Sequence, residues 1–325
     1  LKQRVSLRTR VVSWRSIGKD SRKGLRMGDE YKAAKEAFYQ GHSGGSSLEI
    51  QLITAVAPIS LFLSQAVGIS LSSPSGGPVA ALLATLCTTL PLYASFVAPQ
   101  HAVHILAAQL LAATLVIFGI GNGVRSTARA MESAADVLNR PHKPFLVSYR
   151  GTMMLATCLA ILAVDFHAFP RRLAKTETFG VSLMDAGVGS VLLSQATVSP
   201  LARKPSTAMP KRFLSALLSS TPLLLIGSVR LWGTRAADYH EHASEYGVHW
   251  NFFFTLAGVS ILCNLAPLTG WRAAMGAAAL SVGYECVLKA TGLEDWVLNA
   301  ARVDLISANR EGMLGCVGYA SVFYA

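Results

Sequence analysis

Long apolar stretches alternate with shorter polar ones along this chain. A window of roughly 18 or more mostly apolar residues is long enough to cross a bilayer as a helix. A ninth apolar run opens at Met313, after eight such windows at 52–71, 79–99, 102–121, 151–168, 183–200, 213–232, 251–269 and 272–290. A large soluble enzyme with buried helices rarely contains so many of them. The pattern therefore predicts an all-α fold, a polytopic transmembrane helical bundle with eight full spans and a truncated ninth.

The composition supports a membrane protein. Of the 325 residues, 52% are hydrophobic and only 14% are charged, whereas about 25% are charged in ordinary soluble domains. The five cysteines lie scattered in or beside apolar runs, and none has CxxC spacing. We interpret them as small core residues and predict no metal site and no disulfide framework. They are Cys87, Cys158, Cys263, Cys286 and Cys316.

The start of the chain is strongly basic. Residues 1–26 contain nine Lys or Arg against one acid, Asp20, which is +8 of the whole-chain net charge of +11 and leaves +3 for the remainder. They form either a basic targeting or membrane-surface arm or translated upstream sequence with Met27 as the true start, and we favour the second. The remaining charge gives no argument for nucleic-acid binding. We therefore expect a non-native leader, 1–26, a polar and amphipathic N-terminal segment, 27–51, and a membrane domain, 52–325, that is incomplete at its C-terminus.

The Lys and Arg residues of the loops predict the orientation, because cytosolic loops carry the excess of basic residues. The loops fall alternately into two sets. The first set holds ten basic residues and two acids, in loops 72–78, 122–150, 201–212 and 270–272. The second set holds six basic residues and eight acids, in loops 100–101, 169–182, 233–250 and 291–312. We therefore expect the first set in the cytosol and the second, together with residues 27–51, in the lumen of the endoplasmic reticulum (ER).

The stretch from Asp165 to Gly189 places more ionisable residues close to membrane depth than any other part of the chain. A carboxylate in hydrocarbon costs at least ~2.5 kcal/mol at mid-bilayer, so one at the end of a span usually has a partner or a task. Asp165 lies just inside the end of an apolar run, and Pro170 is expected to end the helix that carries it. The chain can therefore fold back and bring Lys175 towards Asp165.

This pair has two interpretations. The Asp165 carboxylate can accept a proton from an attacking hydroxyl, and the Lys175 ammonium can stabilise the oxyanion of an acyl transfer. A structural ion pair at the membrane boundary, with neighbouring basic side chains that reach the interface, explains the residue types equally well. The residue types alone leave both interpretations open.

A second polar segment, Asp238–Phe254, contains two histidines around an acid. His240, Glu241 and His242 are residue types that bind metals, but H-x-H without a second ligand set at fixed spacing is common by chance. An aromatic belt at the membrane interface explains the rest of the segment.

A third polar segment, Ser307–Gly312, precedes the last apolar run. It places Asn309 and Arg310 at a helix start, which suits binding of a phosphate. A polar cap where the chain enters the membrane explains the segment equally well.

These segments resemble the inositol acyltransferases of glycosylphosphatidylinositol (GPI) anchor synthesis, the PIG-W family and its fungal wall-protein-transfer counterparts. The matching stretches are KEAF and GGSSLEIQLITAVAP near the start, YRGTMMLATCLAILAVDFHAFPRRLAKTETFGVSLMDAGVGS in the middle, and then EYGVHWNFFFTLA and ISANREG. They occur in order and cover Lys35 to Gly312. The resemblance implies a multi-pass ER membrane enzyme that transfers a fatty acyl group, typically palmitoyl, from acyl-CoA to the inositol of glucosaminyl-phosphatidylinositol on the luminal side.

The resemblance also implies roles for particular residues. The acid and the lysine of the family motif match Asp165 and Lys175, which we expect to be the catalytic pair. Acyl-CoA would be a co-substrate with no bound cofactor, and the other partners would be the glucosaminyl-phosphatidylinositol lipid and the membrane, with no nucleic acid. Family members have further spans, so this chain would lack their C-terminal part. Arg171 and Arg172 are candidates for contacts with phosphates of CoA or of the lipid. The other candidates for substrate contacts are Glu177, Asp185, His249, Asn251, Asn309 and Arg310.

Two other classes of protein share some of these features. Intramembrane charges and glycine-broken helices also mark transporters, and a non-catalytic transporter or scaffold would fit them. A two-fold internal repeat would favour a transporter, and the spans show none. Other membrane-bound O-acyltransferases rely on a histidine deep in the membrane, whereas the histidines here lie at the ends of the spans.

Overall fold

The computed structural model describes residues 42–70, 78–119, 144–176, 180–203, 209–237 and 243–325, together with positions 30, 31, 34, 37 and 38. The chain forms two compact units, Leu1–Gly41 and His42–Ala325. The described positions of the first unit are helical. The second unit contains the apolar stretches and the residues discussed below.

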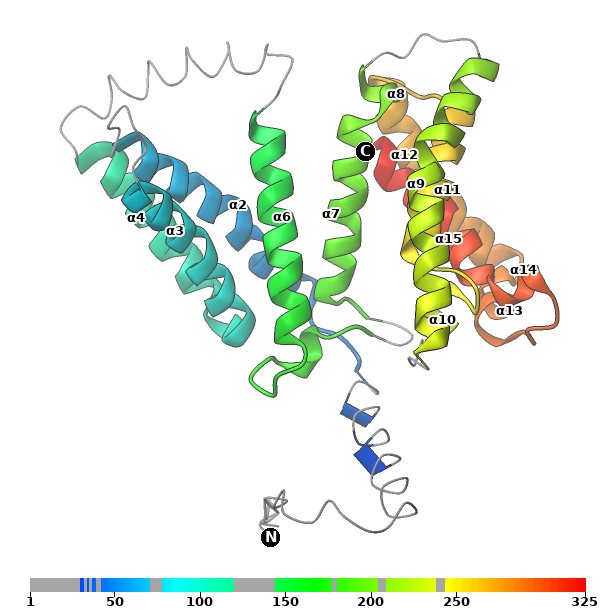
Figure 1. Ribbon diagram of the computed structural model, residues 1–325, viewed down its shortest axis with the longest axis horizontal. Coiled ribbons are helices and arrows are strands. Elements are labelled where there is room, and N and C mark those ends of the chain that lie inside the picture. The colour runs from blue at the N-terminus through cyan, green and yellow to red at the C-terminus, as the bar shows by residue number, and fades with distance from the viewer. Residues whose placement is uncertain are drawn as a thin grey trace. The chain divides into compact units, whose positions relative to one another are not determined.

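Helices dominate the second unit (Figure 1). The long ones are α2 (Ser47–Ser70), α3 (Pro78–Val97), α4 (Ala102–Gly119), α6 (Pro144–Ala163), α7 (Leu183–Val198), α9 (Met209–Ala236), α11 (Phe252–Leu265), α12 (Trp271–Ala290) and α15 (Arg310–Tyr324). The short ones are α8 (Pro200–Arg203), α10 (Ala243–Tyr246), α13 (Leu293–Asn299) and α14 (Leu305–Ala308), with 3-10 turns η1 (Pro99–His101) and η2 (Arg171–Leu173). The one β-contact among the described residues is an isolated bridge between Gly45 and Val181. The predicted all-α fold is confirmed.

The predicted number of spans is not confirmed. Each of the eight apolar windows coincides with a long helix, but only four of the described segments are both long and apolar enough to cross a membrane. These are Ser47–Gln65, Pro99–Phe118, Phe145–Ala163 and Met209–Ala236. The apolar windows of α7 and α11 run on into turns, so their helices have only 16 and 14 residues, whereas a perpendicular span needs about 20. In α12, the ion pair between Glu285 and Lys289 lowers the apolar character.

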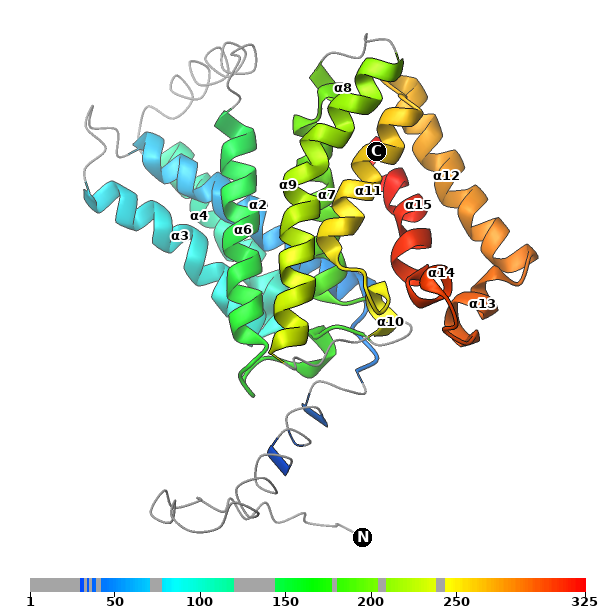
Figure 2. The same ribbon diagram turned by 45° about the vertical axis from the view of Figure 1, so that its right-hand side comes forward.

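The long helices pack in two groups that α7 joins. In the first group, α2 packs against α3, α4 and α6; in the second, α11 packs against α9 and α15, and α15 against α12 (Figures 1 and 2). Helix α7 contacts α6 on one side and α15 on the other. The side chains of Ile53 and Val56 are fully buried in the first group, and those of Val259 and Cys263 in the second. The apolar windows thus provide the buried core of both groups as well as the surface for lipid.

Every second connection lies at the same end of the unit, the lower end in Figure 1. There the backbone N–H of Gly45 donates to the carbonyl of Val181 at 2.9 Å, and that of Val248 donates to Ala308 at 2.8 Å. A hollow of about 260 Å³ lies between the start of α2 and η1, and Gln100 is one of the residues that line it. The connection at 100–101 therefore lies at this end as well. These connections are the second predicted loop set, together with the end of the N-terminal segment. The described residues of that set thus lie at one end, and the side of the membrane on which they lie stays a prediction.

Candidate active site

Four segments that are distant in the sequence meet at this end: residues 43–49, 164–182, 245–251 and 304–311. Hydrogen bonds and ion pairs join the first to the second, the second to the third, and the third to the fourth. They overlap the four stretches that carry the resemblance, GGSSLEIQLITAVAP, the central stretch, EYGVHWNFFFTLA and ISANREG. The fold therefore collects them in one place.

Two glycines allow these segments to approach closely. Gly180 has a φ of +135°, and a Cβ there would lie 2.3 Å from the carbonyl oxygen of Ser43. Gly247 has a φ of +108°, and a Cβ there would lie 2.5 Å from the Cα of Asn309. Both positions require glycine, because any larger residue would be strained and would push the neighbouring backbone away.

The central segment reverses direction around Pro170, as predicted, but its helix ends earlier than predicted. Helix α6 ends at Ala163, so Asp165 lies in the turn beyond the helix and not inside it. Tight turns follow, with hydrogen bonds from Phe166 N–H to the Ala163 carbonyl (3.0 Å) and from Phe169 N–H to Phe166 (3.1 Å). The helix can end early because an arginine side chain donates hydrogen bonds to carbonyls of this turn, which would otherwise need helical partners.

That arginine is Arg171. Its Nη2 donates to the carbonyls of Val164 at 2.8 Å and Phe166 at 3.1 Å, and its Nε donates to Phe169 at 3.2 Å. Its guanidinium carbon lies 5.5 Å from the centre of the Phe169 ring. Asp165, which lies between Val164 and Phe166 in the sequence, is exposed. Arg171 is therefore bound to the loop that carries Asp165.

Apolar contacts hold the same turn on the core. Phe169 and Leu173 are 3% and 1% exposed, and they pack with Ile50, Ile53 and Phe96. The turn thus presents its charged side chains outward while its apolar ones are fixed. Burial of two such side chains is worth about 1.5–3 kcal/mol each.

Arg172 binds the start of α2. Its Nη2 lies 2.8 Å from Glu49 Oε1, and its Nε lies 3.2 Å from both carboxylate oxygens. This hydrogen bonding raises the pKa of the Arg172 guanidinium further. The pair joins the N-terminal stretch to the central one, and a phosphate contact for Arg172 stays a prediction.

Lys175 forms its ion pair with Glu245, and not with Asp165, the partner that the sequence predicts. Lys175 Nζ lies 2.5 Å from Glu245 Oε2, and the two side chains are 28% and 24% exposed. Glu245 lies on α10, in the stretch EYGVHWNFFFTLA. Burial, and then the negative charge of Glu245, raise the pKa of Tyr246 well above its usual range, so its phenol stays protonated.

The sequence reasoning missed Glu245 as a site residue. In the sequence, Glu245 counts only as one of the eight acids of the second loop set. A signal was available, because Glu245 is the one carboxylate in the EYGVHWNFFFTLA stretch. A charged side chain beside an aromatic run at the membrane interface needs a partner, and Lys175 is that partner.

Two of the predicted substrate contacts, Asn251 and Asp185, hold the backbone of these segments. Asn251 caps α11 by accepting from the N–H groups of Phe253 and Phe254, and it donates to the Gly227 carbonyl at 2.8 Å. Asp185 accepts from the backbone N–H and the hydroxyl of Ser182 at 2.8 and 2.9 Å. It therefore caps the start of α7.

Asn309 joins the third and fourth segments. Its Oδ1 accepts from the backbone N–H of His249 at 2.7 Å, and its Nδ2 donates to Leu305 at 2.8 Å. The imidazole Nδ1 of His249 is buried, and no hydrogen-bond partner for it occurs in the described part of the chain. Asn309 is itself 3% exposed, so its position is set by the backbone that it bridges.

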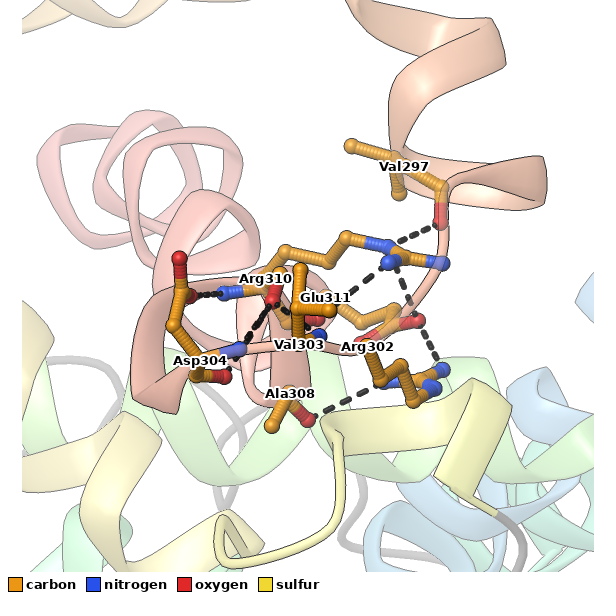
Figure 3. A network of polar contacts seen from close by, with 8 residues as sticks. Val297, Arg302, Val303, Asp304, Ala308, Arg310 and Glu311 are labelled. Carbon is orange, nitrogen blue, oxygen red and sulfur yellow. Dashed lines mark hydrogen bonds and ion pairs between the residues drawn. The ribbon is translucent and has the colours of Figure 1, made fainter.

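Arg310 is enclosed in the polar network of Figure 3. It is 2% exposed; its Nε donates to the Val297 carbonyl at 2.6 Å and its Nη1 to Ser307 at 3.2 Å. Glu311 pairs with Arg302, whose Nη1 also donates to the Ala308 carbonyl at 3.0 Å. Arg310 therefore donates to main-chain carbonyls on both sides of the turn, and its predicted contact with a phosphate stays a prediction.

Several predictions lie outside the described residues. Glu177 is one of them, and the segment with His240, Glu241 and His242 is another. Among the residues that are described, no group of three or more His, Cys, Asp or Glu side chains could hold a metal ion.

Comparison with known proteins confirms the resemblance. The family model described as GWT1 matches residues 31–325. The GPI-anchored wall transfer protein 1 of Emericella nidulans is 38% identical over 320 residues, which cover 92% of this chain and 67% of the relative. The protein of the same name from Gibberella zeae is 38% identical over 323 residues, with 91% and 64% covered. The phosphatidylinositol-glycan biosynthesis class W protein of Dictyostelium discoideum is 32% identical over 343 residues, with 91% and 69% covered.

The chain thus spans about two thirds of the length of these relatives. The family match covers nearly all of it, including the four segments that meet at one end of the helices. The chain belongs to the GWT1 family.

Proposed function

We propose that this protein is an acyltransferase of GPI-anchor biosynthesis, which transfers a fatty acyl group from acyl-CoA to the inositol of glucosaminyl-phosphatidylinositol in the ER membrane. The names of the relatives support a role in GPI synthesis. The observation that carries the proposal is the convergence of four distant segments around the turn from Asp165 to Lys175. Four apolar helices that can cross a membrane suit a lipid substrate.

In the proposed mechanism, Asp165 is the general base. Its carboxylate takes the proton of the inositol hydroxyl as the oxygen attacks the thioester carbon. The carbonyl oxygen becomes an oxyanion in a tetrahedral intermediate. When the intermediate collapses, the carbon–sulfur bond breaks, the ester remains on inositol, and the CoA thiolate takes the proton from Asp165. The site is proposed to face the ER lumen.

Lys175 would stabilise the oxyanion. A lysine ammonium has three N–H donors, so the contact with Glu245 leaves donors for a substrate. The side chain is partly exposed, and its ammonium is fixed by Glu245. A cation that is already in place when charge develops contributes more than one that must move to it.

The decisive experiment exchanges the two charges. Lys175→Glu and Glu245→Lys are made singly and together in the full chain, and acyl transfer from radiolabelled acyl-CoA to the glycolipid is measured in microsomes, with folded yield measured in parallel. If Lys175 is catalytic, the double variant recovers folded protein but not transfer. Recovery of both would show that the pair is only structural.

A matched variant tests the base. Asp165→Asn keeps the shape of the side chain, and we expect transfer to fall by about 10²–10⁴-fold, the usual contribution of a general base. Near-normal turnover in Asp165→Asn and in Lys175→Ala would refute the assignment and favour a transporter or scaffold.

A further inference from the structure

Arg171 contacts the loop of the proposed base on both sides. It donates to the carbonyl of Val164, which precedes Asp165, and to that of Phe166, which follows it, at 2.8 and 3.1 Å. A third hydrogen bond reaches the Phe169 carbonyl at 3.2 Å. The backbone of Asp165 is therefore held between two carbonyls that bind the same guanidinium nitrogen.

We propose that Arg171 is the positioning residue for Asp165, and not a contact for a substrate phosphate. This inference rests on the proposed function, in which Asp165 is the base. A guanidinium is planar and presents its donors in a fixed fork. Bound to three carbonyls of one turn, it sets the backbone geometry from which the Asp165 side chain projects.

The turn needs such a group. Helix α6 ends at Ala163, and the last carbonyls of a helix have no partner within the helix. An unpaired carbonyl is especially costly near the hydrocarbon of a membrane. Arg171 pairs the carbonyl of Val164, just beyond the helix, with a donor from the chain that has folded back at Pro170.

Arg171 is in turn fixed to the core. Its guanidinium carbon lies 5.5 Å from the centre of the Phe169 ring, and Phe169 is 3% exposed, within the apolar cluster beneath the turn. A continuous set of contacts therefore runs from the core through Phe169 and Arg171 to the backbone of Asp165.

The two roles for Arg171 predict opposite kinetics. Loss of a phosphate contact weakens binding of acyl-CoA or of the lipid in the ground state, which raises KM and leaves kcat unchanged. Loss of a positioning residue displaces the base and lowers kcat, on the order of 10²-fold for a displacement of about 1 Å. Lysine also separates the roles, because it keeps the charge that a phosphate needs but not the planar fork.

The experiment compares Arg171→Lys and Arg171→Gln with Arg212→Lys. Arg212 is the matched control, since its Nε donates to a helix-end carbonyl, that of Asn264, at 2.9 Å near the end of α11. The full chain is assayed in microsomes for kcat and for KM of both acyl-CoA and the glycolipid, with rates normalised to folded protein. We expect both Arg171 variants to lose kcat on the order of 10²-fold at unchanged KM, and the control to keep its activity.

Three results would overturn the inference. A raised KM with normal kcat in Arg171→Gln, corrected by Arg171→Lys, would show a phosphate contact. An equal loss in Arg212→Lys would show general destabilisation. Failure of both Arg171 variants to fold would show that Arg171 holds the whole unit and not Asp165. The proposed function fails separately, through normal transfer by Asp165→Asn, whatever Arg171 does.

Discussion

Two clusters of basic and acidic side chains at the same end of the helices differ in their exposure. In the first, Arg310 is 2% exposed and Glu311 has 11% of its side chain exposed. In the second, the side chains of Arg172, Lys175 and Glu245 are 47%, 28% and 24% exposed. We call these the enclosed cluster and the open cluster.

The difference separates support from chemistry. In the enclosed cluster the donors of Arg310 bind main-chain carbonyls of α13 and α14, and Glu311 pairs with Arg302 (Figure 3). The cluster therefore holds α13, α14 and α15 together. In the open cluster charged groups meet across the ends of helices and remain accessible. Substitutions should therefore affect stability in the first cluster and turnover in the second.

The largest effect is expected for Arg310→Met in the enclosed cluster. The substitution leaves the carbonyls of Val297 and Ser307 without this donor, and each buried polar group left unsatisfied costs about 1–3 kcal/mol. Thermal unfolding of the protein in detergent should show a much lower Tm and little folded protein. Arg310→Lys, which keeps the charge, should lose less; a wild-type Tm for Arg310→Met would place Arg310 outside the structural framework.

Glu245→Gln should act mainly on turnover. The amide keeps the shape and an acceptor, but it holds the Lys175 ammonium less firmly. We expect kcat for acyl transfer to fall roughly 10-fold, equivalent to about 1.4 kcal/mol, while Tm changes little because the pair is partly exposed. Glu245→Asp is the matched control and should keep part of the activity. An unchanged kcat in Glu245→Gln would remove Glu245 from the site.

A smaller effect is expected where the open cluster meets α2. The pair between Arg172 and Glu49 is exposed enough that its contribution to unfolding should be about 0.2–1 kcal/mol. A double-mutant cycle with Arg172→Gln and Glu49→Gln measures this coupling directly. A coupling several times larger would mean that this pair behaves like the enclosed cluster.

The smallest effect concerns pH and Asp304, which caps α14. The backbone N–H of Ser307 donates to its carboxylate at 2.7 Å and, with the Ser307 side chain, lowers the pKa of Asp304 from its ordinary value of 3.8. A lowered folded-state pKa stabilises the fold above the ordinary pKa, and this contribution is lost as the pH falls through the lowered one. The difference in Tm between the wild type and Asp304→Asn should therefore vanish in strong acid. A difference in Tm that stays constant down to strong acid would contradict the stabilising role of the Asp304 carboxylate.

The helices could be predicted from the sequence because apolar windows are local features. The grouping of loops was also predictable, since successive long helices reverse direction. Helix length was not, because apolar residues continue into turns: the window 251–269 includes Pro267, and α11 ends at Leu265. A proline restricts the residue before it to extended geometry, and this limits the helix more than hydropathy does.

The candidate site could be predicted only in part. The turn at Pro170 follows from one residue, and the structure contains it. The partner of Lys175 could not be predicted in this way, because Glu245 lies 70 positions away and only tertiary packing brings it close. For the same reason the end of α6 was misplaced: it depends on the Arg171 side chain returning from beyond the turn.

The long-range contacts of the site also impose an order of assembly. Arg172 and Glu49 are 123 positions apart, so the ion pair at the start of α2 can form only after the central segment has been synthesised. The ion pair of Lys175 then requires Glu245 on α10, and the hydrogen bond of His249 requires Asn309, 60 positions later. A contact cannot form before both residues have left the ribosome, and distant pairings form late in any case. The site is therefore completed only when Asn309, just beyond α14, has been made. A nascent chain that stops earlier has its first helices but lacks the assembled site.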